Sequence, residues 1–344
     1  MTVSAPSDSA VDFRSLLVTE LEHAGLIPDA ERVMTCRRDV TRLGSEEAAN
    51  LASLVGSPLW IQALAQLGRP FPQADCERVL GFGALLTAFM LPPVRIDEAL
   101  KHDVCTLGAY ANLLVGLFDQ VADECSDVEL PLSRALIESA CKGKGRARLA
   151  WRSRRGTPLA RLLARLLSEY VRRLDRLPYS GRHGPVRALQ TRVILSMHAA
   201  ELETLRAASR VNDRAVRRKS ALPFVAMALP GWLAADQVPP MTFRAHLRWL
   251  YRLGIFVGWI DDAVDLDADR TAGRPNRVAA SLACESPCKP ERLARAIARE
   301  GARIQTERRI SARHADTDVL PTVVLSWLDA IPHGEPFRVD VITP

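Results

Sequence analysis

The residues best suited to chemistry in this 344-residue chain are aspartates that follow an apolar run. The stretch GIFVGWIDDAVDLDADR, residues 254–270, contains Asp261, Asp262, Asp265, Asp267 and Asp269. Residues four apart share a helix face, so Asp261, Asp265 and Asp269 would form one stripe with Asp262 beside it. Aspartate is a poor helix former, and like charges one turn apart repel. The pattern therefore indicates that something positive lies against this stripe.

A second acidic stripe occurs earlier in the chain. The segment GLFDQVADECSDVE places Asp119, Asp123 and Asp127 at successive steps of four, again after an apolar run, LGAYANLLVGLF. Two such stripes at the ends of apolar helices could face each other across a cavity. Carboxylate oxygens in that arrangement bind hard divalent cations, and magnesium usually shares its ligand shell with substrate phosphates.

The acidic stripes are open to two other interpretations. An acidic run on an exposed helix is often only a solvated face, and this alternative stays open for either cluster alone. A calcium-binding EF-hand loop would place Asp265, Asp267 and Asp269 at its first, third and fifth positions. Its sixth position would then be Arg270 instead of glycine, and its twelfth would be Asn276 instead of glutamate. The calcium loop is therefore rejected.

Basic residues lie close to these clusters in the sequence. Arg217, Arg218 and Lys219 are expected to precede an apolar helix, and Arg270 and Arg274 follow the second acidic stripe. Such side chains could balance the charge of a diphosphate, although a basic triplet alone is often surface decoration. The basic segment 142–155 could contact a polyanion, but a solvated inter-helix loop is favoured because no nucleic-acid-binding signature accompanies it.

The elements that must position these residues are helical. Apolar residues recur at spacings of three and four over residues 11–26, 46–68 and 159–177, and alternating strand-like patterns are almost absent. We expect an all-α protein of about ten or more helices. Residues 1–10 are expected to be a disordered N-terminus, residues 11–344 one helical domain, and residues 11–75 an accessory helical layer.

Composition narrows the functional class. The chain is 48% hydrophobic, carries a net charge of +6 and has a pI near 9.1, which suits anionic partners. Seven cysteines without a CxxC pair indicate reduced thiols, and neither a signal peptide nor a membrane span is evident. We expect a cytoplasmic protein. No catalytic Ser/His/Asp or Cys/His pairing stands out, and His198 and His246 are interpreted as structural.

These segments resemble those of the class I isoprenoid synthases, all-helical enzymes that ionise allylic diphosphates with magnesium. RRKSALPFVAMALPGWLAA followed by GIFVGWIDDAVDLDAD resembles the lysine segment and second aspartate-rich motif of trans-prenyl diphosphate synthases. DLDADRTAGR and FDQVADE resemble the two DxxxD motifs of squalene and phytoene synthases. The resemblance covers roughly residues 105–130 and 215–276 and implies an isoprenoid synthase fold around a central apolar cavity.

The resemblance assigns roles to individual residues. Catalytic and magnesium-binding roles fall on Asp119, Asp123, Asp261 and Asp265, with Asp262 and Asp269 as additional metal ligands. It implies three magnesium ions bound with the diphosphate, which would contact Lys219, Arg218, Arg270 and Arg274. Aromatic side chains suited to a cavity that shields a carbocation are Tyr110, Phe118, Phe224, Trp232, Trp249, Phe256 and Trp259, although core packing is the favoured interpretation for each.

The departures from the family pattern favour one reaction. Phe118 precedes Asp119 where chain-elongating enzymes have a second aspartate, and Gly258 stands where glutamine is usual. The N-terminal Gly-Lys-x-Arg segment for a second diphosphate is missing. These losses affect mainly the second-substrate site, so the resemblance implies a terpene synthase that cyclises one linear prenyl diphosphate. The alternatives are a prenyltransferase, head-to-head or onto a non-isoprenoid acceptor, and a catalytically silent prenyl-binding protein. The partner expected is a prenyl diphosphate and not nucleic acid, with a homodimer possible.

Overall fold

The computed structural model describes most of the chain. The described residues are 8–27, 30–55, 57–65, 73–124, 132–142, 157–178, 181–206, 213–283 and 289–311. The basic segment 142–155, apart from Lys142, and Asp127 lie outside them, and the side chain of Asp123 is not described.

The described residues form helices almost throughout. The helices are α1 (Asp8–His23), α2 (Ala30–Val55), α3 (Ser57–Leu64), α4 (Gln73–Phe89), α5 (Glu98–Glu124), α6 (Arg134–Cys141), α8 (Pro158–Leu174), α9 (Gly184–Arg206), α10 (Asp213–Leu233), α11 (Pro240–Val264), α12 (Leu266–Ala272), α13 (Arg277–Leu282) and α14 (Pro290–Ser311), with a short 3-10 turn at Gly181–His183. Within these residues, β pairing is limited to one bridge between Ile96 and Ala235. The all-α prediction is confirmed.

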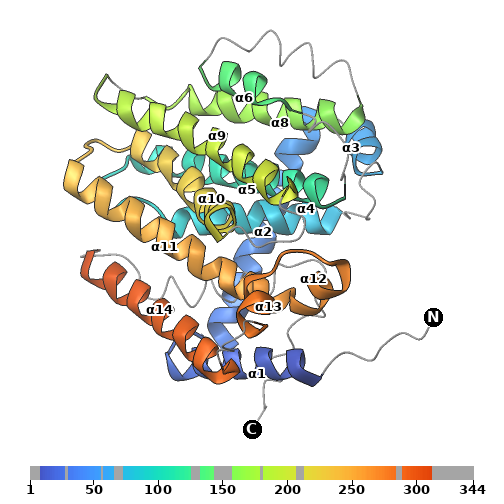
Figure 1. The fold of residues 1–344 in the computed structure, drawn as a ribbon. Helices are drawn as coiled ribbons and strands as arrows, with labels where there is room; N and C mark the ends of the chain where they lie inside the picture. Colours follow the sequence, from blue (N-terminus) through green and yellow to red (C-terminus); the bar gives the residue numbers. More distant parts are fainter. Residues whose placement is uncertain are drawn as a thin grey trace.

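Helix α10 occupies the centre of the bundle. It packs against α9, α11 and α5, while α4 packs between α2 and α5 (Figure 1). Helices α1 and α14 pack on each other and lie on the α11 side of the molecule. The first helix begins at Asp8, within the stretch expected to be disordered.

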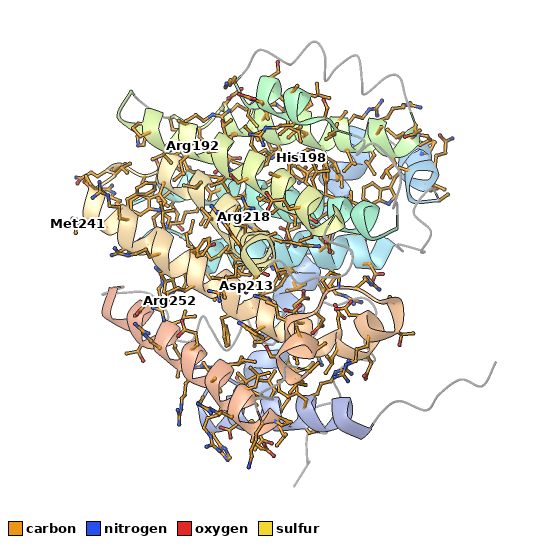
Figure 2. The ribbon with its side chains drawn as sticks, viewed as in Figure 1. Arg192, His198, Asp213, Arg218, Met241 and Arg252 are labelled. Atoms are coloured by element: carbon orange, nitrogen blue, oxygen red, sulfur yellow. The ribbon has the colours of Figure 1, made fainter. Side chains whose placement is uncertain are left out.

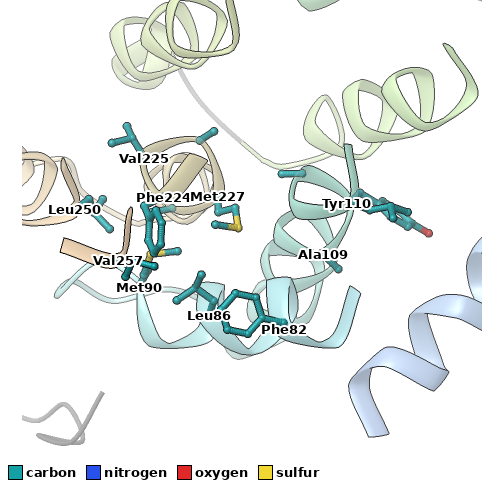
Figure 3. Packing of buried hydrophobic residues seen from close by; sticks show 14 of the residues in the cluster. Phe82, Leu86, Met90, Ala109, Tyr110, Phe224, Val225, Met227, Leu250 and Val257 are labelled. Carbon is teal, nitrogen blue, oxygen red and sulfur yellow. The ribbon is translucent and has the colours of Figure 1, made fainter. Parts of the chain in front are cut away.

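One hydrophobic core connects these layers, from Phe13 on α1 to Ile304 on α14. Figure 3 shows part of it, where Phe224 of α10 lies close to Val257 of α11 and to Met90, which directly follows α4. Phe224 is therefore a packing residue between three helices. Burial of side chains of this size contributes about 1.5–3 kcal/mol each and holds α10 in place.

Two glycines allow α11 to approach α10 closely. A Cβ added at Gly254 would lie 2.6 Å from the Cα of Ala221, and one at Gly258 would lie 2.3 Å from Oγ of Ser220. Both distances are below any van der Waals contact, so only glycine fits this crossing. The close approach brings the second acidic stripe beside the N-terminal half of α10.

One sequence expectation is wrong in detail. The triplet Arg217, Arg218 and Lys219 was expected to precede an apolar helix, but α10 begins at Asp213 and includes all three. The helix also continues through Pro223 and Pro230 to Leu233. The tight packing of the apolar half of α10 outweighs the cost of internal proline, which removes one backbone hydrogen bond.

Candidate functional site

A cavity lies between α5, α6, α8, α9 and α10. Its walls follow helical spacing: Ala111, Leu114, Val115 and Phe118 on α5, Ile194, Met197, His198 and Glu201 on α9, and Lys219, Pro223 and Ala226 on α10, with Leu132, Ile137, Leu167 and Tyr170 completing it. The volume of the cavity that the centre of a water molecule can occupy is about 90 Å³. The wall is almost entirely apolar except at one end.

The charged end of the cavity is formed by three helices. Nζ of Lys219 on α10 forms an ion pair with Oδ1 of Asp119 on α5 and lies 3.2 Å from Oε2 of Glu201 on α9. The side chains of Lys219 and Asp119 are 31% and 42% exposed, whereas that of Glu201 is 11% exposed. The cavity therefore joins an apolar interior to a charged entrance that solvent can reach.

The two prolines of α10 shape the cavity wall. Proline lacks the N–H that would bond the carbonyl four residues earlier, which is Lys219 for Pro223 and Ala226 for Pro230. The carbonyl of Ala226 accepts instead from Nε2 of Gln190, at 3.1 Å, and that Nε2 also lies 2.5 Å from the hydroxyl of Tyr170. A buried polar bridge thus replaces the lost helical bond at the end of the cavity far from Lys219.

The second acidic stripe crosses a helix boundary without losing its register. Helix α11 ends at Val264 and α12 begins at Leu266, with Asp265 between them. The backbone N–H of Asp265 donates to the carbonyl of Asp261 at 2.9 Å, and that of Asp269 donates to the carbonyl of Asp265 at 2.8 Å. Asp261, Asp265 and Asp269 therefore keep the helical spacing that their sequence predicts.

Asp262 differs from its neighbours because it forms a buried ion pair. Nε of Arg277, at the start of α13, donates to Oδ2 of Asp262, and the arginine side chain is only 3% exposed. Nη2 of Arg277 lies 3.3 Å from Oγ of Ser220, and its guanidinium lies 4.9 Å from the ring centroid of Trp259. A Cβ at Gly258 would lie 2.4 Å from that same Nη2. The glycine thus makes room for Arg277.

Asp269 is held by the turn that follows α12. Nδ2 of Asn276 donates to Oδ2 of Asp269 at 2.9 Å, and Nε of Arg274 lies 3.5 Å from Oδ1. Asn276 also caps α13, because its Oδ1 accepts from the N–H of Ala279. Gly273 ends α12 with φ of +66°, the left-handed conformation that glycine adopts without strain. The turn formed by residues 272–276 therefore orients Asp269.

Negative charge accumulates around Asp265. Burial raises the pKa of Asp265 to about 6, with a further increase from Asp269 and smaller opposing effects of Arg274 and Arg14. Burial also raises the pKa of Asp262, against the effect of Arg277. Asp265 therefore lies next to another carboxylate, Asp269, whereas Asp262 is paired with Arg277. This donor chemistry fits a hard cation.

Helix α1 contributes to this region from the other end of the chain. Nε of Arg14 donates to the carbonyl of Ala263 at 3.0 Å, and its Nη2 donates to that of Val264. These carbonyls end α11, where a cation also opposes the partial negative charge of the helix terminus. Nη2 of Arg14 lies 4.0 Å from a carboxylate oxygen of Asp267.

The structure brings some predicted residues together and not others. Phe118 and Lys219 line the cavity, and Asp119 pairs with Lys219, whereas Phe224 and Trp259 are not among its described lining residues. The remaining aromatic candidates, Tyr110, Trp232, Trp249 and Phe256, are buried in the core and likewise do not line it. Arg218 pairs with Glu203, and Arg270 is exposed on α12.

A complete metal site is not assembled from the described side chains. Among them, no three histidine, cysteine, aspartate or glutamate residues are grouped closely enough to hold an ion. The side chain of Asp123, a predicted ligand, is not described. Magnesium sites that share ligands with a substrate phosphate need few protein groups, so the acidic stripe around Asp265 still fits that type of site.

Sequence reasoning missed several residues of this region. Glu201, Tyr170, Arg277, Asn276 and Arg14 were not singled out. For Glu201 a signal existed, since it continues the spacing of three and four from Ile194 along α9. For Arg277 and Arg14 the sequence contains no such signal. Arg14 lies on α1, far from the acidic stripe in the chain, and Arg277 lies on α13, which a turn separates from the stripe.

Comparisons with known proteins give limited information. No family model matches the sequence, and no curated protein matches it. Among solved structures, the chain is similar to a polyprenyl synthase from Caulobacter crescentus CB15 complexed with calcium and isoprenyl diphosphate. The match has a TM-score of 0.39 and 14% identity, and covers 82% of this chain and 96% of that one. These values are too low to transfer a property of that protein to this chain. Within the described residues, no helix is both long and apolar enough to cross a membrane.

Proposed function

We propose that this chain is a class I isoprenoid synthase that ionises a linear allylic prenyl diphosphate and cyclises the resulting carbocation to a terpene. The observation that carries the proposal is the apolar cavity with one charged end, where Lys219 meets Asp119 and Glu201. An apolar chain attached to an anionic head group needs such a cavity.

The diphosphate would bind at the charged end. Lys219 is partly exposed, and ion pairs in such positions contribute only about 0–1 kcal/mol, so its ammonium can exchange a carboxylate for a phosphate oxygen at little cost. Arg218, Arg270 and Arg274 remain proposed contacts. Of these, Arg218 would have to leave Glu203 and Arg274 would have to leave Asp269.

The acidic residues would hold the metal. We propose Asp119, Asp123, Asp261 and Asp265 as ligands, with Asp269 held ready by Asn276. Bound magnesium would supply Lewis-acid stabilisation of the charge that develops on the departing diphosphate. Asp262 is the least suited of the predicted ligands, because Arg277 already balances its charge.

The cavity wall would protect the cation. A water molecule needs roughly 10–15 Å³ of such space, so the cavity has room for several waters, but its wall offers few polar partners to hold them. Phe118 and Tyr170 present aromatic rings, whose faces attract cations. A prenyl chain is larger than this space, so lining side chains must rotate when it binds.

One observation favours a different class. Lys219 already compensates Asp119, so the charged end is stable without a metal and could belong to a silent prenyl-binding protein. A prenyltransferase remains the enzymatic alternative. Metal dependence distinguishes the silent protein from the two enzymes, and the demand for a second substrate distinguishes the enzymes from each other.

The test is incubation with allylic diphosphates of increasing length, with and without magnesium, followed by gas chromatography and mass spectrometry. We expect a cyclic hydrocarbon or alcohol from one substrate with magnesium alone. Product formation only after addition of isopentenyl diphosphate or another acceptor would assign a prenyltransferase. Lack of consumption of every substrate would favour the silent protein.

We further propose that residues 11–344 form one domain, with residues 11–75 as its accessory layer, and that the protein is cytoplasmic and forms a homodimer. The continuous core from α1 to α14 supports a single unit. Size-exclusion chromatography with light scattering tests the dimer.

A further inference from the structure

His198 lies within the cavity stripe of α9, between Met197 and Glu201. Its side chain is 7% exposed, and its ring meets that of Phe118 edge to face, with centroids 6.2 Å apart. Figure 2 shows His198 in the part of the molecule formed by α6, α8 and α9. No pattern in the sequence indicates more than a structural role for this residue.

The hydrogen bonds of His198 define which ring nitrogen is basic. Nε2 lies 3.2 Å from the carbonyl oxygen of Leu132. Because a carbonyl oxygen can only accept, Nε2 must carry the hydrogen, and in the neutral ring Nδ1 then carries a lone pair. Nδ1 is buried and has no hydrogen-bond partner within the described part of the chain. A buried polar atom without a partner is unusual and suggests a role with a ligand.

The surroundings keep the ring neutral. Burial lowers the pKa of His198, the bond to Leu132 opposes this, and the charge of Arg134 on α6 lowers it further. The other charged groups at the cavity are Glu201, on the same helix, and Lys219 with Asp119 at the charged end. At neutral pH the ring can therefore accept a proton.

We propose that Nδ1 of His198 is the base that ends the reaction by taking a proton from the carbocation. The proposal rests on the proposed function. A C–H bond next to the cationic carbon breaks, and its electron pair forms the new C=C bond. The proton binds to Nδ1, giving an imidazolium that later releases it to solvent. The product is an olefin, and no oxidant or reductant is needed.

The register of α9 also indicates where along the substrate this happens. His198 precedes Glu201 by three residues, about 4.5 Å along the helix axis. It is thus closer to the charged end than Ile194 on the same helix, and Phe118, which contacts it, directly precedes Asp119. The proton should come from the part of the substrate that lies near the released diphosphate.

The test compares H198Q with H246Q under single-turnover conditions, using the substrate that the wild-type protein consumes. Glutamine can still donate to the carbonyl of Leu132 but is not basic at neutral pH. His246 is also buried, bonds to Trp232 and does not line the cavity. In H198Q we expect unchanged diphosphate release, olefin formation slower by about 10²-fold, and more water-quenched alcohol. In H246Q we expect the wild-type olefin fraction.

Each other outcome has a separate meaning. An unchanged olefin fraction in H198Q would overturn the inference and leave the proposed function intact. Loss of diphosphate release in a folded H198Q would place His198 in ionisation and overturn it as well. Lack of diphosphate release by the wild-type protein would overturn the proposed function and this inference with it. Nitrogen NMR of histidine-labelled wild-type protein needs no variant, and a charged or Nδ1–H ring at pH 7 would contradict the proposal.

Discussion

Two ion pairs flank the N-terminal half of α10, and they differ in burial. Lys219 pairs with Asp119 at the open end of the cavity, where the side chains are 31% and 42% exposed. The next residue along, Ser220, contacts Arg277, whose pair with Asp262 is 3% and 12% exposed. The first pair can exchange partners with a ligand in solvent. In the second pair, the guanidinium of Arg277 supplies the positive charge next to Asp262 that a cation from solution would otherwise supply.

The difference shows how one acidic motif can serve two purposes. A half-exposed pair contributes little stability and can be rearranged by a ligand, whereas breaking a buried pair leaves an uncompensated charge at high cost. Asp262 therefore maintains the α11–α13 junction, whereas Asp261 and Asp265 are proposed to bind metal. The predictions below test this division.

The largest effect is expected from Arg277→Met. The change leaves the carboxylate of Asp262 buried without its partner, so the free energy of unfolding should fall by about 3–5 kcal/mol. Chemical denaturation measures the loss. The double variant Arg277→Met with Asp262→Asn should recover part of it, because the orphaned charge is gone. A loss below about 1 kcal/mol would contradict the structural role of the pair.

Asp119→Asn should act on activity and not on stability. Turnover should fall by at least about 10²-fold because the charged end loses a proposed metal ligand, while the free energy of unfolding should change by less than about 1 kcal/mol. Asp213→Asn is the matched control, since Asp213 pairs with Arg217 at 2.8 Å on the exposed start of α10. Steady-state kinetics with circular dichroism measures both. Equal activity of the two variants would exclude a role of Asp119 in the proposed site.

Gly258→Ala tests the space that Arg277 occupies. Its Cβ would lie 2.3 Å from Oγ of Ser220 and 2.4 Å from Nη2 of Arg277, so we expect a loss of about 1–3 kcal/mol from overpacking. Gly116 on α5 is the control, because a Cβ there meets nothing within 4 Å. Gly116→Ala should instead stabilise the helix by about 0.5–1 kcal/mol. Similar effects at both positions, measured by thermal unfolding, would exclude the packing explanation.

The smallest effect concerns a buried ionisable group that lacks an opposite charge. Burial lowers the pKa of His246 to about 3, and its Nδ1 accepts from Trp232 at 2.9 Å, so the ring is neutral. Below pH 6.5 the unfolded chain gains a proton that the folded chain does not. Stability should therefore fall with decreasing pH, by up to about 1.4 kcal/mol per unit. Denaturation between pH 7 and 5 should show this slope in the wild-type protein and a reduced slope in His246→Gln. Equal slopes would mean that another group causes it.

Much of the fold was predictable because it depends on local pattern. The spacing of three and four over residues 11–26 and 159–177 corresponds to α1 and α8, since a helix needs one apolar stripe to pack. The position of the basic triplet inside α10 was not predictable. Pro223 favours a break in the helix, and only the packing of α10 outweighs that preference.

The helical spacing of the second acidic stripe was predictable, and the wall of the cavity was less so. The four-residue spacing of Asp261, Asp265 and Asp269 survives the junction between α11 and α12 because the backbone hydrogen bonds continue through it. Among the predicted cavity aromatics, Phe118 lines the cavity while Phe224 and Trp259 do not. An aromatic side chain at helical spacing looks the same in a core as in a pocket, so sequence alone does not distinguish them.

The sequence by itself determined the all-helical class and the helical spacing of Asp261, Asp265 and Asp269, because these follow from patterns within single segments of the chain. Only the tertiary structure decided that Arg277 neutralises Asp262, that Arg14 closes the end of α11 and that His198 faces the cavity. The physical reason is that each of these contacts joins different helices. Its partner is chosen by the close approach of backbones, as at Gly258, and not by the residues next to it in the chain.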